Sequence, residues 1–131
     1  MAFRLFDPEC PASQALVTKW VNWFKQHRKI LNSDIVHLRR PDLSSIDAML
    51  HVNSNTTKTA DRAMLMIWNQ TPHHEKQTLK VPLYYTGLAT QASVSVEGGA
   101  PKMYTLARDF SISLPVSLSP MSLTWVLIKE E

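Results

Sequence analysis

The sequence has little of several features that define common classes of protein. It contains one cysteine, Cys10, so no disulfide can form within the chain. It has no apolar run of the roughly 18 residues that a membrane-spanning helix needs, so we expect no such helix. The first residues, "MAFRLFDPECPAS", hold no long apolar segment, which argues against a signal peptide and leaves the compartment open. The net charge of +3 includes no extended basic run, so we expect no binding to nucleic acid.

The sequence does contain enough apolar material for one folded domain. It has 131 residues, of which 44% are hydrophobic and 19% are charged. This length is typical of a single domain, and this composition is typical of a globular chain rather than a disordered one.

An amphipathic helix is predicted over residues 14–31. Apolar side chains recur there every three or four residues, as one buried helix face requires. Ser13 is the predicted N-cap, and Asp7 followed by Pro8 is an earlier alternative start. Basic residues gather near the end of the segment, where the helix dipole favours cations.

Trp20, Trp23 and Phe24 form a broad aromatic face on this helix. A face of this size needs a large surface to pack against, and a small β domain offers little. We therefore expect these three residues to contact another domain or chain.

Short strands follow the helix at regular spacing. Turn signals rich in Pro, Gly, Asn and Asp separate them, and one segment, 62–69, is nearly continuous and apolar, as a central strand buried on both faces would be. About eight strands predict a mainly β fold, an antiparallel sandwich or barrel preceded by one helix. The predicted strands are 34–40, 45–52, 62–69, 75–83, 92–97, 102–106, 109–114 and 122–128.

The first two strands form a predicted hairpin with one polar face. Pro41 belongs in its turn, because proline cannot donate a ladder hydrogen bond. If Arg40 pairs with Ile46, Arg39 lies opposite Asp47 as an ion pair, and His37 lies opposite Met49. We interpret His37, Arg39, Asp47 and His51 as an interface surface; the alternative is an acid–base site, which would lack an accompanying nucleophile or phosphate-binding loop.

Other candidate sites have simpler interpretations. His73 and His74 are adjacent on an extended segment and would point apart, so we expect no metal site, and no pattern indicates a cofactor. The carboxylate pair that glycoside hydrolysis requires is not evident, so no catalytic residue is predicted. Tyr84 and Tyr85 flank a turn and could stack on a sugar ring. Trp68 and Trp125 are expected in the core. Two glycosylation sequences, at Asn55 and Asn69, are not expected to be used without a signal peptide.

The segments "HRKILNSDIVHLRRPD" and "VPLYYTGL", with a looser closing "SLSPMSLTWV", resemble the C-terminal region of α-galactosidase-like (melibiase-like) glycoside hydrolases. The resemblance covers about residues 14–128. It implies that 14–32 is similar to the last helix of a (β/α)₈ barrel and that 33–131 is the C-terminal β-sandwich. Residues 1–13 are an N-terminal lead outside the resemblance. The hairpin turn departs from the family, with "PDLSS" in place of "PDG".

The resemblance also implies what the chain lacks. In such enzymes the catalytic carboxylates lie on the barrel, which takes about 250 residues, and none maps onto this sequence. We therefore predict a non-catalytic accessory sandwich, a fragment whose partner is a barrel domain in cis or another chain, and whose parent could be secreted. The alternatives are a free-standing carbohydrate-binding module and, third, a small enzyme using the polar hairpin face.

Overall fold

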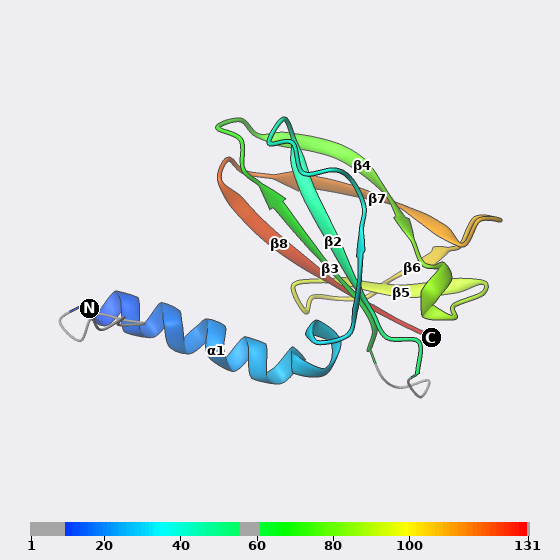
Figure 1. Cartoon of the computed structure of the whole chain (residues 1–131), viewed down its shortest axis with the longest axis horizontal. Coiled ribbons are helices and arrows are strands. Elements are labelled where there is room, and N and C mark those ends of the chain that lie inside the picture. The colour runs from blue at the N-terminus through cyan, green and yellow to red at the C-terminus, as the bar shows by residue number, and fades with distance from the viewer. Residues whose placement is uncertain (1–9, 56–60, 131) are drawn as a thin grey trace.

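The computed structural model describes residues 10–55 and 61–130. It confirms a mainly β fold of eight antiparallel strands behind one helix (Figure 1). A six-stranded sheet has the order β1-β2-β3-β8-β5-β6, and a two-stranded sheet pairs β4 with β7. Among the described residues, no helix is long and apolar enough to cross a membrane. The elements are α1 (Pro11–Leu31), β1 (Asp34–His37), β2 (Ile46–Val52), β3 (Asp61–Asn69), β4 (Glu75–Pro82), η1 (Tyr84–Thr86), β5 (Gln91–Val96), β6 (Lys102–Thr105), β7 (Ser111–Leu118) and β8 (Ser122–Lys129).

The main core lies between the two sheets. Residues spaced two apart on β2, such as Leu50 and Val52, turn inward and meet the inward side chains of β4 and β7. This alternation was predicted, and the structure confirms it for β2. The β4–β7 pair therefore covers one face of the large sheet and completes a sandwich.

The central strand β3 is buried on both faces, as its apolar run predicts. Leu65 and Ile67 face the main core, while Met64 and Met66 face the opposite side, where Ile30 of α1 covers them. The helix is thus a third layer, and β3 needs apolar residues at consecutive positions because it lies between two layers.

The helix begins earlier than predicted. It starts at Pro11 with Cys10 as its N-cap, and Ser13 lies inside the first turn, so the predicted cap is wrong. Proline is favoured at the first helical position because its φ suits a helix and its missing N–H needs no partner there. The alternative start at Asp7 lies outside the described residues. The predicted basic residues do occupy the last turn, as Arg28 and Lys29.

The first hairpin has the predicted register but not the predicted ion pair. His37 lies opposite Met49, as expected. The strand ends at His37, however, and Arg39 turns into the loop, where its guanidinium lies 3.3 Å from the Asp42 carboxylate. Asp47 instead accepts a hydrogen bond from the Ala48 N–H at 2.9 Å. The predicted ion pair between Arg39 and Asp47 is therefore wrong, because the chain leaves the β1–β2 ladder before Arg39.

Strand β7 runs further than predicted, from Ser111 to Leu118, and includes Pro115 opposite Thr78 of β4. The β4–β7 sheet has only two strands, so each is an edge strand on its other side. Proline is tolerated there because the N–H that it lacks has no ladder partner on that side.

Candidate functional site

One face of α1, from Leu16 to Arg28, carries an apolar groove that no described residue covers. Figure 1 shows the N-terminal half of the helix extending beyond the sandwich, while the end of the helix lies against the sheet. Leu16 is 56% exposed and Phe24 is 41% exposed. A solvent-facing apolar stripe of this kind normally marks an interaction surface. We call it the α1 groove; it is open to solvent and is lined by Leu16, Val17, Trp20, Val21, Phe24, Lys25 and Arg28.

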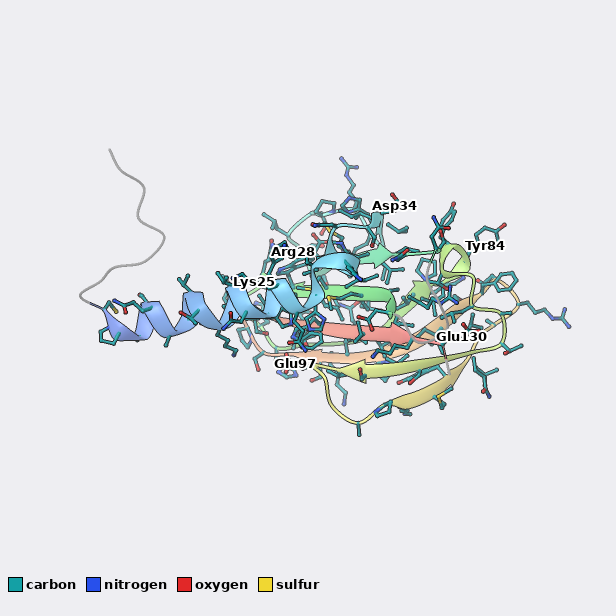
Figure 2. The ribbon with its side chains drawn as sticks, turned by 90° about the horizontal axis from the view of Figure 1, so that it is seen from below. Lys25, Arg28, Asp34, Tyr84, Glu97 and Glu130 are labelled. Carbon is teal, nitrogen blue, oxygen red and sulfur yellow. The ribbon has the colours of Figure 1, made fainter. Side chains whose placement is uncertain are left out.

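Basic residues border one edge of the α1 groove. The Arg28 guanidinium lies 5.7 Å from the centre of the Phe24 ring, a cation–π contact across one turn. Lys25 also lines the groove, and Figure 2 shows Lys25 and Arg28 on the same stretch of helix. A partner with carboxylates beside an apolar ridge would complement this surface.

The C-terminal half of α1 is held to the sheet by aromatic contacts. The ring centre of Trp125 on β8 lies 5.6 Å from that of Trp23 and 5.0 Å from that of His27. Trp23 is therefore half-buried within the chain, as is Trp20, whereas Phe24 is exposed. Trp68 and Trp125, predicted in the core, are half-buried at this junction.

Two histidines are buried where α1 meets the sheet. His27 on α1 and His51 on β2 are each 8% exposed. Desolvation by burial lowers the pKa of His27; the charge of Asp61 opposes this effect, and that of Lys129 adds to it. Desolvation also lowers the pKa of His51, and a hydrogen bond to the Leu31 backbone opposes it. Both imidazoles therefore favour the neutral form in the folded chain.

The polar hairpin residues do not converge into one reactive site. His37 is exposed, His51 is buried beneath α1, Arg39 bonds to Asp42, and Asp47 bonds to a neighbouring backbone N–H. An acid–base mechanism would need these groups within reach of one substrate.

The described residues contain no group of three or more His, Cys, Asp or Glu side chains placed to hold a metal ion. His73 and His74 are both exposed, and the His74 Nε2 lies 2.7 Å from the Ser117 hydroxyl on β7. That contact gives His74 a structural partner across the small sheet.

Tyr84 and Tyr85 form an exposed aromatic pair on η1. They are 64% and 63% exposed, and their ring centres lie 5.3 Å apart in an edge-to-face arrangement. The ring centre of Phe110 lies 5.7 Å from that of Tyr84, so Phe110 extends the aromatic surface. A depression of about 460 Å³ adjoins Tyr85 and includes Asp34 and Ser54. Sequence reasoning found the tyrosines but missed Asp34 and Ser54, because only folding brings them beside η1.

Comparisons with known proteins add a likeness of fold. No family model matches the sequence, and no curated protein matches it. Among solved structures, the chain is similar to the crystal structure of AmyP in complex with maltose, with a TM-score of 0.50 and 13% sequence identity. The match covers 88% of this chain and 21% of the AmyP chain. This chain thus shares its fold with about a fifth of a longer protein.

Proposed function

We propose that the chain is a non-catalytic accessory domain of a larger glycoside hydrolase-like protein, in which the α1 groove packs against a (β/α)₈ barrel. The barrel would lie in the same polypeptide or in another chain, and the sandwich would cap and stabilise it. The observation that carries this proposal is the uncovered apolar groove on one face of a helix whose other face is docked on the sheet.

Burial of the groove would supply the energy for such an interface. Each exposed Leu, Val or Phe side chain that becomes fully buried contributes about 1.5–3 kcal/mol. Leu16, Val21 and Phe24 are all exposed enough to gain from a partner. His37, Arg39 and Asp47 would lie near the rim of the same junction, where charged groups set orientation more than affinity.

Two further observations support the proposal. The sequence resembles the region of α-galactosidase-like enzymes in which a last barrel helix is followed by a sandwich, and α1 with the strands behind it has that order. The fold also matches only a fifth of the AmyP chain, whose structure contains maltose, which is compatible with an accessory part of a longer protein.

The size of the native polypeptide tests the proposal directly. An antibody raised against this chain is used to detect the protein in its source. We expect a band several times heavier than 14.9 kDa, or a band near that mass that co-purifies with a barrel-containing chain. A band near 15 kDa in a free monomer would contradict the proposal.

Substitutions in the α1 groove test the surface itself. We expect the isolated chain to bind a hydrophobic dye and to self-associate, and the double substitution Leu16→Glu, Val21→Glu to reduce both several-fold, because charge prevents burial of the stripe. Asn22→Glu is the matched control: it adds a carboxylate on an exposed part of the same helix that does not line the groove. Sedimentation and dye fluorescence measure the effect. If the wild-type chain is monomeric and binds no dye, the proposal that the α1 groove is an interface loses its basis.

The exposed tyrosine pair favours a second candidate function, carbohydrate binding. Adjacent solvent-facing rings beside a depression with a carboxylate and a hydroxyl could hold a sugar. Binding on a glycan array that disappears in Tyr84→Ala or Tyr85→Ala would support this function. A blank array would reject it.

A further inference from the structure

A separate cleft lies where α1 approaches β8 and the turn after β5. Figure 2 shows Glu97 in this region, at the end of the sheet that lies under the helix. The cleft encloses about 400 Å³ and, unlike the α1 groove, carries charged groups of both signs. It is lined by Lys19, Trp20, Trp23, Glu97, Leu123 and Trp125.

Three indole rings form the apolar walls of this cleft. The ring centres of Trp20 and Trp23 lie 5.4 Å apart at 78°, and those of Trp23 and Trp125 lie 5.6 Å apart at 60°. Each ring therefore braces the next edge to face, which is a favourable aromatic geometry. Trp20, at the end of this series, also lines the solvent-facing α1 groove.

Glu97 is held at the cleft by an unusual backbone conformation. Its φ is +50°, in the left-handed region where a residue other than glycine is strained. Its N–H donates to the Trp125 carbonyl at 3.0 Å, and the Thr124 hydroxyl donates to its Oε1 at 3.1 Å. A turn that glycine would form more easily thus places Glu97 at the rim of the cleft, with its carboxylate held by Thr124.

The opposite charge comes from Lys19. Its ammonium lies 5.4 Å from the centre of the Trp20 ring. The cleft therefore combines aromatic surface with one charged acceptor and one charged donor, whose charges cancel. A neutral ligand with hydroxyl groups suits this combination, because a hydroxyl can both donate to the carboxylate and accept from the ammonium. With one charge of each sign, the cleft has no net attraction for either a cationic or an anionic ligand.

We propose that this cleft binds a neutral sugar ring, with the C–H face of a pyranose stacked on Trp20 and its hydroxyls hydrogen-bonded to Glu97 and Lys19. This site is distinct from the Tyr84–Tyr85 surface. Because Trp20 also lines the α1 groove, a sugar and the proposed barrel would share this ring, and the inference applies to the chain with its α1 groove uncovered.

Tryptophan fluorescence provides the test, since the walls of the cleft are indoles. The chain is screened on an array of neutral and charged oligosaccharides, and then titrated with maltotriose, methyl α-galactoside and the neutral glycan that binds best. We expect neutral glycans to bind and to change the fluorescence. Trp20→Ala should weaken binding about tenfold or more, and Glu97→Gln should weaken it severalfold, while Tyr84→Ala and Tyr85→Ala leave it unchanged.

Each other outcome overturns the assignment. If Trp20→Ala and Glu97→Gln both leave the affinity unchanged, the cleft is not the binding site. If only the tyrosine variants lose binding, the sugar binds at η1 instead. Binding of tetramethylammonium without any neutral glycan would indicate a cation cage instead. Absence of any response at millimolar glycan would reject the site. Circular dichroism checks folding, and the exposed Glu97→Gln position keeps the test valid if Trp20→Ala fails to fold. The accessory-domain proposal is tested by the size of the native polypeptide, which none of these results affects. The sugar-binding proposal can therefore be rejected without rejecting the accessory-domain proposal.

Discussion

Asn69→Ala is expected to lower the free energy of unfolding by about 3–5 kcal/mol, because it leaves several buried polar groups without partners. Asn69 ends β3 and is only 1% exposed. Its Nδ2 lies 2.8 Å from the His73 carbonyl, 3.1 Å from that of Leu118 and 2.9 Å from that of Ser119. Its Oδ1 accepts from the Thr71 N–H at 3.0 Å and from the Thr71 hydroxyl at 2.8 Å.

This one side chain joins the turn after β3 to the turn between β7 and β8, and so ties the two sheets together. The same geometry buries the Asn69 amide nitrogen, to which a glycan at this sequence would be attached.

Urea denaturation of the purified chain measures this effect. Asn53→Ala is the matched control, because Asn53 makes a local hydrogen bond to the Asn55 N–H at 3.1 Å in a solvent-facing turn. We expect the control to cost about 1 kcal/mol or less. If Asn69→Ala is no more destabilising than Asn53→Ala, the bridging role is wrong.

The second large effect is a loss of stability in mild acid, centred on His27 and His51. Burial lowers the pKa of both below its ordinary value of 6.5. The unfolded chain therefore takes up protons near pH 6.5 while the folded chain still resists them. Stability is complete above that pH and falls as the pH decreases below it, by at most about 1.4 kcal/mol per pH unit for each histidine. Asp61 and Lys129, the charged groups that act on His27, have opposite effects on its pKa.

Both histidines lie at the contact between α1 and the sheet, so protonation should loosen the helix first. We expect the fluorescence of Trp23 and Trp125 to change between pH 7.5 and about pH 5 before the sandwich unfolds. The double substitution His27→Phe, His51→Gln should remove most of this pH dependence, since neither new side chain titrates. His37→Gln, which removes an exposed imidazole from the same sheet, is the control and should retain it. An equal acid response in the double variant would contradict the assignment.

Local patterns in the sequence predicted the strands and their buried faces well. The alternation of Ile46, Ala48, Leu50 and Val52 identified the inward face of β2, and the register of His37 opposite Met49 followed from the turn at Pro41. Such features could be predicted because side-chain direction in a strand has a period of two and because a hairpin pairs near neighbours.

The errors occurred where a local pattern had competing solutions. Ser13 is a reasonable cap by type, but Pro11 suits the first helical position and moves the start to Cys10. Arg39 would face Asp47 if the ladder continued, but Asp42 is nearer once the chain turns away at His37.

The sequence by itself determined a mainly β chain behind one amphipathic helix, because hydrophobic periodicity is a local property. Only the tertiary structure decided which half of that helix is covered and which polar groups meet. The sheet accepts Trp23, His27 and Ile30 but ends before it can cover Leu16. Lys19 and Glu97 share a cleft, and Asn69 reaches Leu118, only because strands distant in sequence become neighbours. These contacts depend on long-range pairing, which no short pattern of residues encodes.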